Sequence, residues 1–130
     1  MPKLTILVAE DQQHVRKLIS YKLENSGYAV VTAEDGAEAL VKIREVKPTL
    51  VLLDVMMPLM TGFEVLVAMK SDEATKHIPV LLVTAQSKEE EILRGLELGA
   101  EDYITTKLRR QLGAGSSDPH PDFPYRNDSE

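Results

Sequence analysis

The chain has 130 residues, of which 43% are hydrophobic and 28% are charged, and its formal net charge is −6. This length and composition suit one compact domain and exclude two full ones, while the acidic charge argues against a nucleic-acid surface. Cysteine is absent, which excludes a disulfide framework and a thiolate zinc site, and the N-terminal apolar run is too short for a signal peptide or a membrane span. We therefore expect a soluble, cytoplasmic protein that contacts neither DNA nor membrane.

Short apolar runs and helical patterns alternate along the chain. Strands are predicted at residues 4–9, 28–33, 50–53, 78–84 and 103–106. Helices between them are predicted from apolar positions at Val15, Leu18, Ile19 and Leu23, at Ala37, Leu40, Val41 and Val46, at Phe63, Leu66, Val67 and Met69, and at Ile92, Leu93 and Leu96. The fourth of these helices has Ser87 as its predicted N-cap, with Glu90 at capping-box spacing. This alternation, with right-handed crossovers, predicts an α/β fold with a doubly wound, five-stranded parallel sheet in the flavodoxin-like order 2-1-3-4-5.

The end of the chain departs from this alternation. A fifth helix would follow residue 107, but two glycines and three prolines between residues 113 and 124 allow no more than about two turns of helix there. We therefore expect a domain at residues 1–107 and, at residues 108–130, an atypical Gly/Pro-rich tail in place of the last helix.

Two of the predicted buried strands end in acidic residues. Residues 50–53 lead directly into Asp54, and residues 4–9 lead into Glu10 and Asp11. Because the carboxyl ends of parallel strands meet at one edge of a sheet, these carboxylates should lie close together and repel. A divalent cation relieves such repulsion, and ligands that are all oxygen favour Mg²⁺ or Mn²⁺ over zinc.

Asp54 then has two roles open to it. It is either a metal ligand only, or a nucleophile that attacks a phosphoryl group to form an aspartyl phosphate. The second role calls for a hydroxyl and a cation on neighbouring strand ends, and Thr84 and Lys107 stand at those places.

Five motifs stand in order and at compatible spacing. They are Glu10-Asp11, Asp54 followed by Val55-Met56-Met57-Pro58, Gly62-Phe63-Glu64, Thr84-Ala85, and Gly99-Ala100-Glu101-Asp102-Tyr103-Ile104-Thr105. Over residues 3–107 this set resembles the receiver domain of bacterial two-component response regulators, a group that includes the chemotaxis receivers.

The resemblance implies a role for each matched residue. Asp54 would be the phosphoacceptor, and Asp11, Asp54 and the backbone carbonyl of Met56 would hold Mg²⁺, with Glu10 holding it through water. Thr84 would hydrogen-bond the phosphoryl group, and Tyr103 would rotate inward as Thr84 moves toward it. Lys107 is the candidate cation for the phosphoryl group.

The resemblance also implies partners rather than a substrate. The donor would be a sensor histidine kinase or a phosphotransfer protein, and the output would be a downstream protein or effector domain whose binding changes on phosphorylation. The chain would be no enzyme beyond its own phosphorylation and dephosphorylation.

One departure from the family pattern leaves alternatives open. The family places lysine directly after the Ile-Thr pair and follows it with proline, whereas here the string is Ile104-Thr105-Thr106-Lys107-Leu108. A shift of one residue would aim Lys107 away from Asp54 unless a bulge re-aims it. The altered end is also expected to leave apolar surface for the tail or for a second chain, as a dimer or swapped assembly.

Two other functions remain open. One is a phosphorylation-independent adaptor, a pseudo-receiver that keeps the acidic site but no longer switches. The other is a hydrolase with an aspartate nucleophile, which Met56 disfavours because a general acid would be expected at that position.

Overall fold

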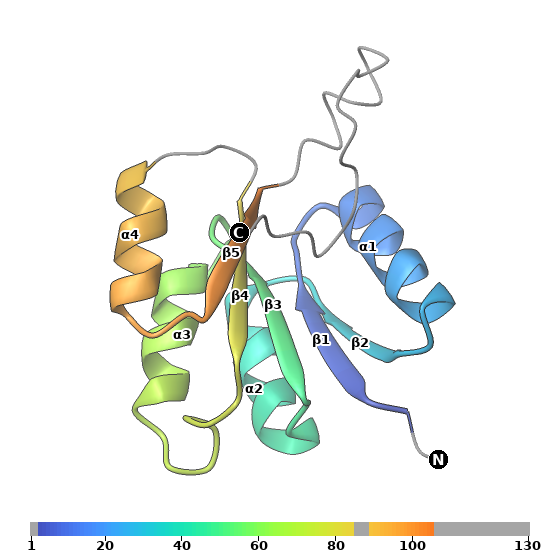
Figure 1. The fold of residues 1–130 in the computed structure, drawn as a ribbon, viewed down its shortest axis with the longest axis horizontal. Coiled ribbons are helices and arrows are strands. Elements are labelled where there is room, and N and C mark those ends of the chain that lie inside the picture. The colour runs from blue at the N-terminus through green and yellow to red at the C-terminus, as the bar shows by residue number, and fades with distance from the viewer. Residues whose placement is uncertain (1–2, 85–88, 106–130) are drawn as a thin grey trace, which may run out of the picture.

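The computed structural model describes residues 3–84 and 89–105, which form five strands and four helices (Figure 1). In chain order they are β1 (Thr5–Ala9), α1 (Gln13–Asn25), β2 (Ala29–Ala33), α2 (Gly36–Val46), β3 (Leu50–Asp54), α3 (Gly62–Lys70), β4 (Val80–Thr84), α4 (Glu89–Glu97) and β5 (Asp102–Thr105). The predicted α/β alternation is confirmed.

All strand pairs are parallel, and the order in the sheet is β2-β1-β3-β4-β5, as predicted. Ala9 at the end of β1 pairs with Ala33 of β2 and Leu53 of β3. Asp54 pairs with Val83, one residue before the end of β4. The carboxyl ends of all these strands therefore meet at one edge of the sheet.

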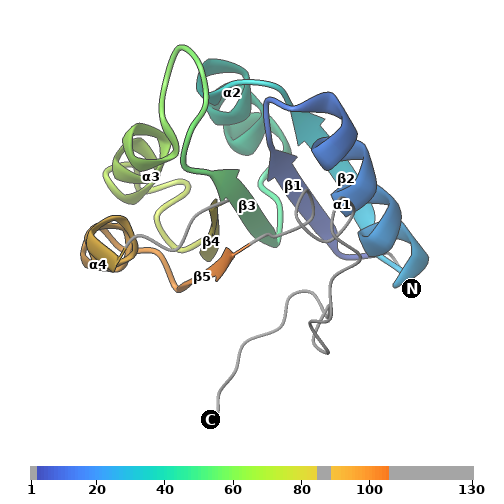
Figure 2. The ribbon, with the colours of Figure 1, turned by 90° about the horizontal axis from the view of Figure 1, so that it is seen from above.

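Helices cover both faces of the sheet, with α1 on one side and α2 and α3 on the other (Figure 2). Alternate residues of each central strand point to opposite faces, so Leu7 and Leu53 belong to one hydrophobic cluster while Val8 and Leu52 belong to another. Both faces of β1 and β3 are therefore buried, which explains why their sequences are continuously apolar.

The predicted buried face of α2 is wrong in part. Val41 and Val46 are 54% and 40% exposed, whereas Ala39 and Ile43, one helical turn apart, are completely buried. Part of the buried face of α2 is therefore formed by Ala39, a small residue that adds little to an apolar pattern. In α3, likewise, Val67 is 45% exposed.

The predicted apolar face of α4 is also corrected. Leu93 and Leu96 are 58% and 37% exposed, and the buried residue of α4 is Gly95. A Cβ atom at Gly95 would overlap Cδ1 of Leu82, so the absence of a side chain brings α4 against the sheet. Arg94 lies over the ring of Phe63, with 5.5 Å between the guanidinium carbon and the ring centroid, and links α4 to α3.

Several predictions lie outside the described residues. They concern the cap at Ser87, the strand end at Thr106, the cation Lys107 and the tail at residues 108–130. Within the described parts of the chain, no helix is both long and apolar enough to cross a membrane.

Candidate functional site

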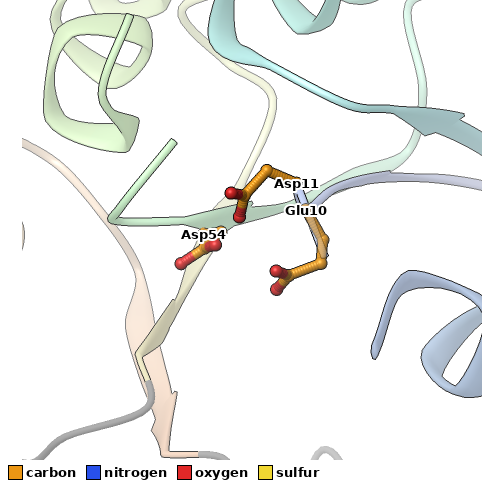
Figure 3. A group of neighbouring side chains, drawn as sticks. All are labelled: Glu10, Asp11 and Asp54. Atoms are coloured by element: carbon orange, nitrogen blue, oxygen red, sulfur yellow. The ribbon is translucent and has the colours of Figure 1, made fainter. Parts of the chain in front are cut away.

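Three acidic side chains meet at the carboxyl edge of the sheet (Figure 3). Glu10 and Asp11 directly follow β1, and Asp54 is the last residue of β3, which pairs with β1. One carboxylate oxygen of each residue lies within 4.8 Å of the others. The structure thus brings together the three acids that the sequence predicts to be neighbours.

The three carboxylates differ in burial. Glu10 is only 6% exposed, Asp54 is partly buried and Asp11 is exposed. These three residues, called the acidic pocket below, are therefore buried at Glu10 and open to solvent at Asp11.

Burial and mutual repulsion perturb two of the acids. Burial, followed by the charge of Glu10, raises the pKa of Asp54 from 3.8 to about 8. Burial is also the main cause that raises the pKa of Glu10. Within residues 3–84 and 89–105 no lysine or arginine forms an ion pair with any of the three acids, so the repulsion favours uptake of a proton.

Backbone amides orient two of the carboxylates. The amide of Gln12 donates to Oε2 of Glu10 at 3.1 Å, and the amide of Met56 donates to Oδ1 of Asp54 at 3.1 Å. Each acid is thus held by the loop that follows its own strand, and each carboxylate keeps a further oxygen for another partner.

The loop after β3 packs tightly behind Asp54. The amide of Gly62, the first residue of α3, donates to the carbonyl of Val55 at 3.0 Å. A Cβ atom at Gly62 would overlap the backbone carbonyl oxygen of Asp54 and lie 3.0 Å from Cα of Val55. Glycine at this position therefore allows the backbone that carries Asp54 to lie against the start of α3.

The other predicted site residues lie as follows. Thr84 ends β4 at the same edge as Asp54, one residue beyond the partner of Asp54, and is 7% exposed. Tyr103 of β5 pairs with Leu82 and packs against the cluster on the α2 and α3 side of the sheet. The side chain of Met56 is 70% exposed.

Sequence reasoning missed Arg16. This residue of α1 donates from Nη1 to the carbonyl oxygen of Glu10 at 2.8 Å and to that of Asp11 at 3.5 Å. The sequence does not predict this contact from an arginine one turn into a helix. The contact depends on the orientation of α1 relative to the loop that precedes it.

The donor set fits a hard divalent cation. Mg²⁺ takes oxygen ligands and commonly binds through one or two carboxylates together with water and phosphate oxygens. The raised pKa of Asp54 is the second observation that supports this fit, since a cation would stabilise the ionised form that burial disfavours.

The family model for the response regulator receiver domain matches residues 6–112 of the chain. A curated relative, the alkaline phosphatase synthesis transcriptional regulatory protein PhoP of Bacillus subtilis, is 45% identical over 100 residues. Those residues are 77% of this chain but 41% of PhoP, so the chain spans less than half the length of that relative.

Two solved structures resemble the whole described fold. The chemotaxis protein CheY4 of Vibrio cholerae is 31% identical with a TM-score of 0.76, and the match covers 86% of this chain and 98% of CheY4. The phosphorylated cyanobacterial phytochrome response regulator RcpA is 34% identical with a TM-score of 0.77, and the match covers 85% of this chain and 86% of RcpA.

Proposed function

Because this chain belongs to the response regulator receiver domain family, we propose that it accepts a phosphoryl group on Asp54 and that this modification changes how it binds a partner. The observation that carries the proposal is the meeting of Glu10, Asp11 and Asp54 within 4.8 Å at the carboxyl edge of a parallel sheet. Such a cluster destabilises the fold unless a ligand uses it, which favours a functional role over a structural one.

Mg²⁺ is the cofactor that we propose for the pocket. Asp11 and Asp54, with the backbone carbonyl of Met56, would hold the ion directly, and Glu10 would hold it through water. Bound there, Mg²⁺ would supply the positive charge that keeps Asp54 ionised and offsets the charge of the phosphoryl oxygens.

The reaction itself is a transfer to a carboxylate oxygen of Asp54. A new O–P bond forms while the bond from phosphorus to the donor breaks, and the bonding electrons leave with the donor nitrogen or acyl oxygen. Since the amide of Met56 already donates to Oδ1 of Asp54, the other oxygen is the one that we expect to attack.

Two neighbouring residues would respond to the product. Thr84 is buried at the end of β4 beside Asp54 in the sheet, and we propose that its hydroxyl binds the phosphoryl group. Tyr103 on β5 would then change its packing, which would carry the signal to the surface formed by α4 and β5. Lys107 is proposed as a phosphoryl ligand if the end of β5 re-aims its side chain.

The partners follow from the family. Receiver domains pair with histidine kinases, and the relative PhoP is a transcriptional regulatory protein. We propose a sensor histidine kinase or phosphotransfer protein as the donor, and a downstream protein or effector domain as the target of the switch. The structure of the similar protein RcpA is of a phosphorylated response regulator, which supports the proposal that this chain is phosphorylated.

The test is incubation of the purified chain with Mg²⁺ and acetyl phosphate, followed by intact mass spectrometry. We expect a gain of one phosphoryl group that is removed by hydroxylamine, as an acyl phosphate should be, and that needs both Mg²⁺ and Asp54. Asp54→Asn should show no gain, whereas the control Glu24→Gln, which removes one exposed charge on α1, should behave as the wild type.

The alternative is an adaptor that binds its partner without phosphorylation. The position of Lys107, one residue later than the family pattern, favours this alternative. Absence of any mass gain over a wide range of acetyl phosphate concentrations would support the adaptor and overturn the phosphoacceptor.

A further inference from the structure

The guanidinium of Arg16 joins the loop that carries two of the three acids to its own helix. Its side chain is 12% exposed, and Nη1 donates to the carbonyl oxygen of Glu10 at 2.8 Å and, at the longer distance of 3.5 Å, to that of Asp11. The bonds go to the main chain, which leaves both carboxylates available for the pocket.

A second contact fixes the orientation of the same guanidinium. Nη2 of Arg16 lies 3.7 Å from Oε2 of Glu34, which directly follows β2. Glu34 is held in turn by its amide, which donates to Oε1 of Glu38 at 2.8 Å. Since Glu34 is 70% exposed, the ion pair contributes little energy by itself. The same guanidinium thus faces Glu34 with Nη2 and the loop after β1 with Nη1.

We propose that Arg16 is a positioning residue for the Mg²⁺ and phosphoacceptor pocket, an inference that rests on the function proposed above. A single side chain holds the carbonyls of two successive residues whose carboxylates belong to the pocket. Loss of that contact frees Glu10 and Asp11 to move together relative to Asp54, which is fixed separately by β3 and the loop after it. Metal sites are sensitive to such changes, because residues that orient the ligands affect affinity strongly.

A lysine at position 16 should keep only part of the positioning effect of Arg16. The guanidinium offers separate N–H groups to the loop carbonyl and to Glu34 in a fixed plane, whereas an ammonium group is a point donor on a flexible stem. Arg16→Lys can keep the bond to the carbonyl of Glu10 but loses the fixed orientation.

The experiment measures Mg²⁺ binding by isothermal titration calorimetry and stability by urea unfolding in EDTA for the full 130-residue chain. The variants are Arg16→Met, which keeps most of the apolar stem, and Arg16→Lys. The control is Arg44→Met, because Arg44 forms an ion pair with Asp72 at 3.4 Å, away from the acidic pocket.

We expect Arg16→Met to weaken Mg²⁺ binding about tenfold and Arg16→Lys to weaken it about threefold. Arg44→Met should leave the dissociation constant unchanged. The yield of phosphorylated protein at limiting Mg²⁺ should follow the same order and should return toward the wild-type value at saturating Mg²⁺. A merely structural role would lower the urea midpoint without this ordered loss of affinity.

Two results would overturn the inference, and they are distinguishable. If the wild type binds Mg²⁺ and folded Arg16→Met binds it equally well, Arg16 does not position the pocket, although the proposed function stands. If Arg16→Met does not fold, an unchanged dissociation constant in Arg16→Lys has the same meaning. If the wild type itself does not bind Mg²⁺, the proposed function fails and this inference fails with it.

Discussion

Replacement of Asp54 by asparagine should stabilise the metal-free protein. The change removes the charge at the centre of the acidic pocket but keeps the shape of the side chain and an oxygen that can accept from the amide of Met56. The stability of a fold depends on pH wherever a group binds protons differently in the folded and unfolded states. The effect of Asp54→Asn should therefore depend on pH in a defined direction.

The sign follows from the raised pKa. Asp54 has a pKa of about 8 in the folded chain and an ordinary value of 3.8, so between these values the folded state keeps a proton that the unfolded state has released. Stability therefore falls as the pH rises through this window. Below pH 3.8 both states are protonated, and the wild type and Asp54→Asn should be about equally stable.

The magnitude can be bounded from the same values. The interval from 3.8 to pH 7, at about 1.4 kcal/mol per pH unit, gives an upper limit of about 4 kcal/mol. Asp54 is only partly buried, and solvent screens part of this repulsion, so we expect about 2 kcal/mol at neutral pH.

The assay is urea unfolding in EDTA, followed by far-ultraviolet circular dichroism, at about pH 5 and about pH 8. Glu24→Gln is the matched control, because it removes one negative charge from an exposed position of α1. An Asp54→Asn protein that is no more stable than the wild type at the higher pH would refute the reasoning. So would a stabilisation that does not shrink toward the lower pH.

Three further changes test other parts of the structure. Mg²⁺ at ten times its dissociation constant should stabilise the wild type by about 1.4 kcal/mol in urea unfolding and should have no effect on Asp11→Asn. Gly62→Ala should cost about 1–3 kcal/mol and reduce phosphorylation by acetyl phosphate, because its Cβ overlaps the backbone of Asp54. Lys47→Gly should stabilise the chain by about 0.5–1 kcal/mol without changing phosphorylation, because Lys47 ends α2 with a φ of 50°.

Each of these has a result that would contradict it. If Mg²⁺ stabilises Asp11→Asn as much as the wild type, the ion binds at a site that does not include Asp11. The control for Gly62→Ala is Gly95→Ala, whose Cβ overlaps the side chain of Leu82 instead of the site backbone. If phosphorylation falls in proportion to stability by the same ratio in both variants, Gly62 has no special role at the site. A Lys47→Gly protein with a lower urea midpoint would show that the conformation of Lys47 carries no strain.

The sheet and its acidic edge could be predicted from the sequence because their signals are local and strong. Continuous apolar runs mark strands buried on both faces, and parallel pairing then requires that Glu10, Asp11 and Asp54 share an edge. Neither step depends on details of side-chain packing. The order of strands and the meeting of the three acids are accordingly both present in the structure.

The helix faces and the contacts of Arg16 could not be predicted in the same way. The buried residues of α2 and α4 include Ala39 and Gly95, and both are small. A Cβ atom at Gly95 would overlap Leu82 of the sheet. Apolar periodicity gives more weight to large residues such as Val41 and Leu93, which are exposed. The bonds of Arg16 to the loop after β1 depend on the angle at which α1 leaves that loop, which no periodic pattern contains.

The residues of the acidic site come from separate segments of the sequence. Glu10 and Asp11 come from the end of β1, Asp54 comes from the end of β3, and a complete helix–strand–helix unit lies between them in the chain. No short excised peptide therefore contains the site, unlike a binding loop that can be transplanted whole. Any truncation or insertion that disturbs the pairing of β1 with β3 would separate the three acids. The phosphorylation proposed for Asp54 would then report whether the central sheet of a shortened chain is intact.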